Sequence, residues 1–258
     1  MAMAVAAMKR PAADVADYFD LQLRFADRVA QASGRPFGEL LGETTNLHRR
    51  FGFGRHDPAA PDPKWRDFVA GLSARPAPED RLAWTLAAYD AAPPEPLPPD
   101  QTAFGVFACE RADEDGQIRI HFHNLGDAEG PEGPLAHSRA PARRAELTAM
   151  FAHIAATQPE ARRLAGASWL YNLEAYRRLF PPAYADSRTP CPEPHRLSGS
   201  STWGQAVDHR GEVRPGMRER LLEGPLDPDA PWRAFPLQAL MTKAPLAVFY
   251  DFYGVLRP

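Results

Sequence analysis

The spacing of apolar residues changes along the chain, and a proline-rich segment marks the change. From residue 14 to 32 apolar side chains recur at helical spacing, whereas from 104 to 122 they alternate with a period of two. Residues 91 to 99, which lie between, hold five prolines, and these donate no backbone hydrogen bond and keep the chain extended. We therefore predict a helical N-terminal region, 1–99, followed by an α/β domain, 100–258.

Further elements follow from periodicity and from the glycines and prolines at their ends. Helices of the N-terminal region are expected over 14–32, 37–51, about 65–72 and 79–91. The second region should contain a hairpin over 104–122 with its turn at 113–116, a helix over 141–157, a strand over 164–172, a short helix over 173–180, a strand over 197–207 and a helix over 215–223. The apolar run 244–254 fits either a buried strand or a helix. The expected fold class is α+β.

Charge and composition limit the class of partner. The 258 residues include 30 basic and 33 acidic side chains, with a formal net charge of −3. This balance lacks the basic surface that polyanion binding needs, so we expect no nucleic-acid partner. No apolar run approaches the ~18 residues that cross a bilayer, so we expect no membrane partner. A small-molecule substrate remains as the expected partner, and the oligomeric state stays open.

Cysteine usage and the N-terminus indicate the compartment. Cys109 and Cys191 stand far apart and outside any C-x-x-C pattern, which is typical of free thiols in a reducing environment. Residues 1–8 are small and apolar but have no basic region before them, unlike a secretory signal. The expected location is the cytoplasm.

Several short motifs occur in the second region, and their order along the chain is informative. They are His121-Phe122-His123 in the hairpin, Gly133-Pro134-Leu135 in a loop, Gln158-Pro159 at a helix end, and Ser168-Trp169-Leu170 followed by Leu179-Phe180-Pro181. The order of hairpin, helix, strand, short helix and strand over 102–207 resembles the acyl-CoA-binding half of GNAT-type acyltransferases. It is most similar to a GNAT-like C-terminal domain that follows a helical N-terminal domain. The resemblance implies a helical N-terminal region packed on a mixed GNAT-like sheet with flanking helices.

The resemblance also implies a cofactor, a coenzyme A thioester. In that superfamily a glycine-rich loop before the central helix presents backbone N–H groups to the cofactor pyrophosphate. The corresponding segment here, 138–144, has no glycine, and its Arg139, Arg143 and Arg144 bind phosphate by charge if they face the ligand. Asn172 matches an asparagine that follows the next strand, and it completes the implied cofactor-binding set.

By the same resemblance the chain transfers an acyl group from an acyl thioester to an amine of a small molecule. His121 or His123 is the expected base for the amine proton, because the unperturbed pKa of histidine lies near neutrality. Tyr176, or its competitor Tyr171, is expected to protonate the departing thiolate.

A segment rich in hydroxyl, small and aromatic side chains suits a ligand-facing strand or loop. It runs from residue 198 to 205 and contributes Ser200, Trp203 and Gln205 as expected substrate-binding residues, together with Trp169 in the preceding strand region.

Two other functions stay open. On a strand His121 and His123 point to the same side, so the pair can chelate a metal if a third ligand joins it. Candidate third ligands are His153, His195, His209 or a carboxylate. The remaining alternative is a non-catalytic binding or interaction module that keeps the fold and has lost the phosphate loop.

Overall fold

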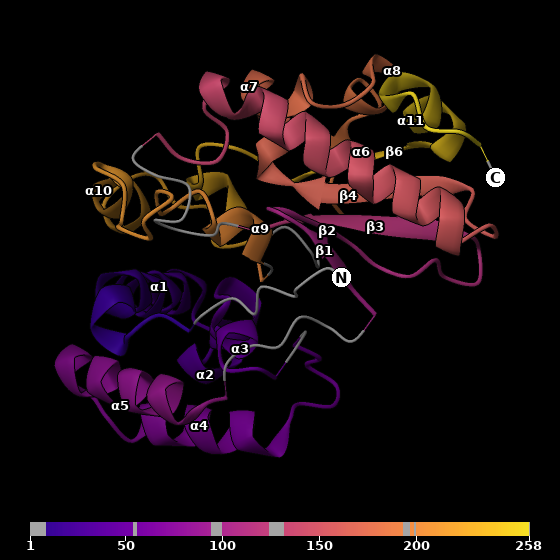
Figure 1. Ribbon diagram of the computed structural model, residues 1–258. Coiled ribbons are helices and arrows are strands. Elements are labelled where there is room, and N and C mark those ends of the chain that lie inside the picture. Colours follow the sequence, from indigo (N-terminus) through magenta and orange to yellow (C-terminus); the bar gives the residue numbers. More distant parts are fainter. Residues whose placement is uncertain are drawn as a thin grey trace. The chain divides into compact units, whose positions relative to one another are not determined.

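The computed structural model describes residues 9–53, 56–93, 100–123, 132–192, 197–198 and 200–257. Over these residues it is an α+β structure with a mixed six-stranded sheet, which confirms the predicted fold class (Figure 1). The chain forms two compact units. We call Leu97–Cys191 with Ala239–Pro258 the sheet unit, and Met8–Pro96 with Pro192–Gln238 the helical unit.

The division at Pro96–Leu97 lies close to the predicted boundary at residue 99, but the helical unit also includes a later segment, Pro192–Gln238. The N-terminal helices share a core with the segment Pro192–Gln238, which the sequence had assigned to the α/β domain. Trp203 shows why: its indole N–H donates to the carbonyl of Thr44 at 2.7 Å, and its ring lies 5.7 Å from that of Phe25. A pattern of local periodicity carries no information on such contacts between distant segments.

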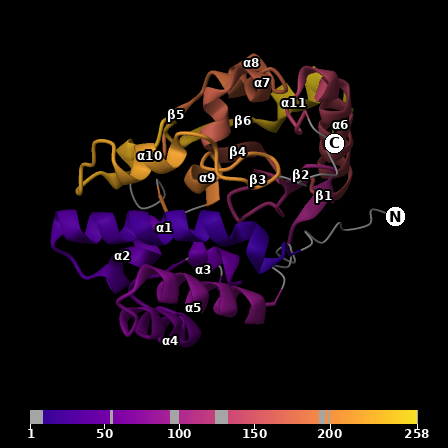
Figure 2. The same ribbon diagram turned by 90° about the vertical axis from the view of Figure 1, so that its left-hand side faces the viewer.

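The helical unit contains most of the helices of the described chain. They are α1 (Ala12–Ser33), α2 (Phe37–Thr44), α3 (Leu47–Arg50), α4 (Pro63–Ser73), α5 (Pro78–Ala91), α9 (Ser200–Trp203), α10 (Met217–Leu222) and a 3-10 turn at Pro231–Ala234. Figure 2 shows α1 lengthwise. Its apolar residues recur at helical spacing and are buried, and it ends where Gly34 adopts a φ of 69° and donates its N–H to Ala30.

The predicted strand over 197–207 is wrong. The described residues of this segment form the short helix α9 followed by turns, and only Val207 makes an isolated bridge, to Val213. Trp203 is completely buried in the core of the helical unit. The small polar residues before Trp203 resemble a strand by composition, but burial of this single large side chain dominates the local conformation.

The sheet unit has strand order β1-β2-β3-β4-β6-β5. The strands are β1 (Thr102–Phe104), β2 (Phe107–Cys109), β3 (Gln117–Phe122), β4 (Arg163–Ser168), β5 (Thr189–Pro190) and β6 (Leu240–Pro245). Strands β3 and β4 are parallel and are joined through α6 (Ala140–Thr157), while the other neighbours are antiparallel. The hairpin and the helix predicted over 141–157 are therefore confirmed, with an extra break at Gly105, where a φ of 61° separates β1 from β2.

Helices α6 and α11 (Leu246–Tyr253) cover one face of this sheet, as Figure 1 shows for α6. Ile118, Ile120 and Leu164 meet Leu147 and Phe151 of α6 there. The C-terminal apolar run contains both elements that the sequence left open, since β6 ends at Pro245 and α11 begins directly after it.

Between β4 and β5 the chain makes short helical turns. Strand β4 stops at Ser168, whose hydroxyl accepts the N–H of Leu170 at 3.1 Å and starts a 3-10 turn, Trp169–Asn172. The predicted strand over 164–172 is therefore shorter than expected, and α7 (Glu174–Arg177) and α8 (Pro182–Ala185) follow it. Among the described residues no helix combines the length and the apolar character needed to cross a membrane.

Candidate functional site

His121 lies on β3 and points away from the core of the sheet unit. Side chains alternate along the strand: Ile118 and Ile120 are buried, Arg119 is exposed, and His121 keeps 34 % of its side-chain surface exposed. Across the antiparallel pair, Ala108 stands opposite His121. Ala108 is completely buried, so the face that carries His121 is covered at this position.

Glu110 is the partner of His121. The backbone N–H of Glu110 donates to Arg119 at 2.9 Å, which extends the β2–β3 ladder by one residue. Glu110 is therefore the diagonal neighbour of His121 on the same face, and its Oε1 lies 2.7 Å from Nε2 of His121. The hydrogen bond with His121 lowers the pKa of Glu110, so the carboxylate is ionised at neutral pH.

This bond fixes the tautomer of the neutral imidazole. An ionised carboxylate only accepts hydrogen bonds, so the proton of His121 is on Nε2, next to Glu110. The lone pair is then on Nδ1, which is the nitrogen able to take a proton. The sequence missed Glu110, although the signal was present: a hairpin that turns at 113–116 pairs residue 110 with 119 and residue 108 with 121.

His123 lies beside His121, with ring centroids 6.3 Å apart and planes at 27°. Burial, and next the neighbouring His121, lower the pKa of His123 to about 4. Its Nε2 is buried without a hydrogen-bond partner. His123 is thus a neutral ring at physiological pH and a weaker base than an unperturbed histidine.

Strands β3 and β4 part next to the histidine pair. Their ladder joins Gln117–Arg163, Ile118–Leu164 and Arg119–Ala165 and ends there, although both strands continue. From Gly166 onward β4 pairs with β6 alone. The facing backbone groups of β3 and β4 beyond Arg119 are therefore not satisfied by each other, and a ligand with amide groups can pair with such edges.

The two candidate tyrosines lie on the core side of the sheet. Tyr176 packs its ring 5.5 Å from that of Phe122, and burial raises its pKa well above the usual value. Tyr171 is also buried, and its hydroxyl lies 2.7 Å from that of Tyr184. Because His121 points to the opposite face, the structure does not bring the tyrosines together with the histidine pair.

The candidate phosphate-binding arginines are engaged within the sheet unit. Arg143 is buried and ion-paired with Glu146 at 2.8 Å, so it faces inward rather than toward a ligand. Arg144 donates to the carbonyl of Phe252 at 2.9 Å and stacks over the ring of that residue at 4.7 Å. Arg139 is half-buried in the 3-10 turn that precedes α6. The loop over 124–131 lies outside the described residues.

The other candidates divide between the two units. In the sheet unit the Asn172 amide donates to the carbonyl of the half-buried Trp169 at 2.8 Å and closes the turn after β4. In the helical unit Trp203 is core, and Gln205 clamps Leu237 through bonds of 2.9 and 3.0 Å. Ser200 begins α9, and its side chain is outside the described residues.

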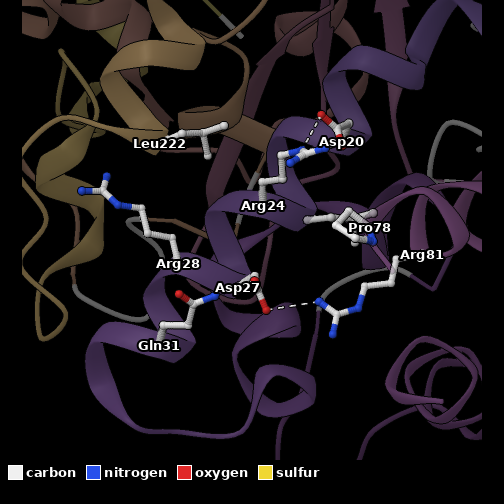
Figure 3. A pocket seen from close by; sticks show the side chains of 9 residues that line it. Asp20, Arg24, Asp27, Arg28, Gln31, Pro78, Arg81 and Leu222 are labelled. Atoms are coloured by element: carbon white, nitrogen blue, oxygen red, sulfur yellow. Dashed lines mark hydrogen bonds and ion pairs between the residues drawn. The ribbon is translucent and has the colours of Figure 1, made fainter. Parts of the chain in front are cut away.

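A pocket of about 290 Å³ opens on the helical unit, between α1, α5 and the end of α10 (Figure 3). Two of its arginines bind acidic residues of the same wall, and the third, Arg28 on α1, donates to the carbonyl of Leu221 at 2.7 Å. Arg24 holds Asp20 through Nε at 2.8 and 3.0 Å, and Arg81 holds Asp27 at 3.1 Å. None of the residues predicted for the site lines it, and of these two ion pairs Arg24–Asp20 lies within α1 while Arg81–Asp27 joins α5 to α1.

Neither a metal site among the described residues nor a known relative adds evidence on function. Within the described ranges, no three His, Cys, Asp or Glu side chains are arranged to hold a metal ion, so the metal alternative gains no support there. His195, one proposed third ligand, is outside those ranges. Cys109 and Cys191 are both buried thiols outside any disulfide in the described chain, as predicted, and burial raises the pKa of Cys109 to about 11. Comparison with family models, curated proteins and solved structures finds no match for this chain.

Proposed function

We propose that the sheet unit is an acyltransferase of the GNAT-like type, which transfers an acyl group from a coenzyme A thioester to an amine, with His121 as the base. The Glu110–His121 pair carries the proposal. A carboxylate that holds an imidazole through one nitrogen, so that the proton is exchanged at the other, is the arrangement needed for proton transfer. The pair stands beside the point where β3 and β4 part.

The reaction needs a single proton relay. The amine nitrogen attacks the thioester carbonyl, and Nδ1 of His121 takes the proton that the nitrogen loses as the C–N bond forms. The C–S bond then breaks, and the imidazolium returns the same proton to the departing thiolate. Glu110 stabilises the imidazolium between the two steps. Tyr171 and Tyr176 are not needed as acids, because they lie on the other side of the sheet.

The parted strands supply a place for the thioester. The pantetheine arm of coenzyme A carries amide groups, and these complement the backbone N–H and C=O groups of β3 and β4 beyond Arg119 and Ala165, where the ladder between the two strands ends. Since Arg143 and Arg144 are held within the protein, we expect the arm rather than the nucleotide to provide most of the affinity.

Calorimetric titration and thiol release test the proposal. Acetyl-CoA should bind the purified protein, S-acetylpantetheine should compete with it, and adenosine 3′,5′-bisphosphate should not. With a panel of primary amines, thiol release should exceed hydrolysis for at least one acceptor. His121→Ala should keep the binding and lose the transfer. Absence of binding by any coenzyme A thioester, or full transfer by His121→Ala, overturns the proposal.

Two parts of the proposal go beyond the site itself. The acceptor is expected to be a small molecule, and the location is expected to be the cytoplasm, where acyl thioesters and free thiols both occur. A non-catalytic module would bind the thioester and give no thiol release with any amine, so the same pair of measurements separates it from an enzyme.

A further inference from the structure

A second cavity, of about 910 Å³, lies within the helical unit. Its size falls in the range of small-molecule sites. The wall combines apolar and polar surfaces, and the side chains that matter here are Leu40, Trp232, Arg35, Glu43, His56, Asp57 and Asp229. We propose that this cavity is a binding site for an alkylammonium ligand, that is, a small molecule with a protonated amine on an apolar chain. The inference is independent of the acyl-transfer proposal.

The charge of the wall favours a cation. Glu43, Asp57 and Asp229 are its acidic residues, and Arg35 is its basic one. Arg35 is already neutralised, because its guanidinium holds Glu43 through bonds of 2.8 and 2.9 Å. Among the described residues no arginine or lysine pairs with Asp57 or Asp229, so two carboxylates remain to attract a positive ligand.

His56 adds an uncharged imidazole to the cavity wall. Its Nδ1 is buried and makes no hydrogen bond. The ring is packed by the aromatic neighbours His48 at 5.2 Å and Trp65 at 5.9 Å. Burial, followed by the charge of His48, lowers the pKa of His56, so the imidazole is neutral and does not repel a cation. His56 therefore contributes a neutral ring to the wall, while its buried Nδ1 is not accessible to a ligand in the cavity.

Gly42 on α2 makes room for this imidazole. A Cβ at Gly42 would lie 2.4 Å from Nε2 of His56 and 2.5 Å from its Cδ2. The ring therefore rests directly against the helix backbone, and a methyl group at this position would have to displace it. Apolar side chains such as Leu40 and Trp232 lie in the same wall and suit the hydrocarbon part of the ligand.

Calorimetric titration with 1,6-diaminohexane at pH 7.5 and low salt tests the assignment, with 1,6-hexanediol and adipate as neutral and anionic probes of the same length. The diamine should bind with a dissociation constant below about 1 mM, and the diol and the diacid at least about tenfold more weakly. Asp57→Asn and Asp229→Asn should each weaken diamine binding roughly fivefold, an effect expected for a partly screened charge pair. Gly42→Ala should weaken it by displacing His56.

Asp67→Asn is the matched control, because Asp67 is an exposed carboxylate on α4 outside the cavity wall. It makes the same chemical change and should leave diamine binding unaltered. Asp57 and Asp229 are exposed, so their variants are expected to fold, and circular dichroism checks this. The proposal is overturned if the diamine does not bind at 10 mM, if adipate binds as tightly, or if both aspartate variants bind like the unmodified chain.

Discussion

Each unit contains a pair of neighbouring histidines, and the two pairs have different partners. In the sheet unit His121 and His123 are 6.3 Å apart, and a carboxylate, Glu110, binds the outer ring at 2.7 Å. In the helical unit His48 and His56 are 5.2 Å apart and pack against aromatic rings. The comparison shows that a histidine pair alone specifies no chemistry, since the partner decides whether a ring becomes an oriented base or part of a wall.

The largest expected effect is on acyl transfer. His121→Ala should lower kcat by about 10²- to 10⁴-fold, the usual contribution of a general base, and Glu110→Gln by about tenfold, because the amide no longer stabilises the imidazolium. Thiol release under saturating acetyl-CoA and amine measures both. His153→Gln on α6 is the control, since this half-buried histidine packs against Phe104 and lies within hydrogen-bond distance of Thr157, outside the Glu110–His121 pair. Equal rates for Glu110→Gln and the unmodified protein would contradict the role of the carboxylate.

Gly166 in the sheet unit and Gly42 in the helical unit both lie against a side chain. Substitution of each by alanine compares the two units by their free energy of unfolding. A Cβ at Gly166 on β4 would lie 2.0 Å from the buried Tyr171 hydroxyl and 2.5 Å from that of Tyr184. Gly166→Ala should therefore lower the free energy of unfolding by about 3 kcal/mol, as overpacking of a core does. Gly42→Ala also meets a ring, but His56 is only half-buried and α2 gains helix propensity, so its cost should stay below about 1 kcal/mol.

Denaturant titration followed by circular dichroism measures both variants. Tyr171→Phe combined with Gly166→Ala is the control for the collision, since removal of the hydroxyl oxygen should recover part of the loss. If Gly166→Ala and Gly42→Ala lowered the free energy of unfolding equally, Tyr171 and His56 would move aside equally easily. That result would contradict the prediction.

Long periodic elements and the hairpin were predictable from sequence because their signals are local. Helix α1 follows from apolar residues at helical spacing, and the turn at Gly116, with a φ of 71°, sets the register that brings Glu110 to His121. The face shared by His121 and His123 was therefore predictable, and Glu110 was within reach of the same reasoning.

Features that depend on distant contacts were not predictable. Trp203 joins the core of the helical unit through Thr44, more than 150 residues earlier in the chain, and no period in 197–207 shows this. The inward turn of Arg143 toward Glu146 is equally hidden, because an arginine near a helix start has the same pattern whether it is buried or exposed. The parting of β3 and β4 depends on the pairing of β4 with β6, which follows from tertiary structure.

His123, the more buried histidine of the sheet-unit pair, should make the free energy of unfolding sensitive to acid. The pKa of His123 is about 4 in the folded chain, against about 6.5 when unfolded, so the folded state disfavours the proton. The free energy of unfolding is therefore highest above about pH 6.5, where His123 is neutral in both states. It falls as the pH drops toward 4, because only the unfolded state takes up the proton. Allowing for partial exposure, we expect on the order of 2 kcal/mol. His123→Gln should reduce the loss of stability between pH 7 and pH 5, measured by urea titration.

The same experiment on His56→Gln completes this test. The pKa of His56 is also lowered, first by burial and then by His48, so its acid effect has the same sign. The half-buried ring should contribute less than His123. If His123→Gln and the unmodified chain lose the same stability between pH 7 and pH 5, the inner ring of the sheet unit is not protected from protonation.

The smallest expected effect concerns carboxylates that the helical unit pairs with arginines. Asp20 accepts from Arg24 at 2.8 Å and from Arg218 at 2.7 Å and keeps 16 % of its side-chain surface exposed, whereas Asp27, paired with Arg81 at 3.1 Å, keeps 37 % (Figure 3). Asp20→Asn should cost about 1 kcal/mol of unfolding free energy and Asp27→Asn about half of that, because solvent screens the more exposed pair. Both costs should shrink in 0.5 M NaCl, and neither variant should alter acyl transfer. Glu110→Gln should show the reverse, a loss of transfer with little change in stability. We infer that Asp20 has a structural role in the helical unit and that Glu110 has a chemical role in the sheet unit. If Asp20→Asn lowered acyl transfer as Glu110→Gln does, this distinction would be wrong.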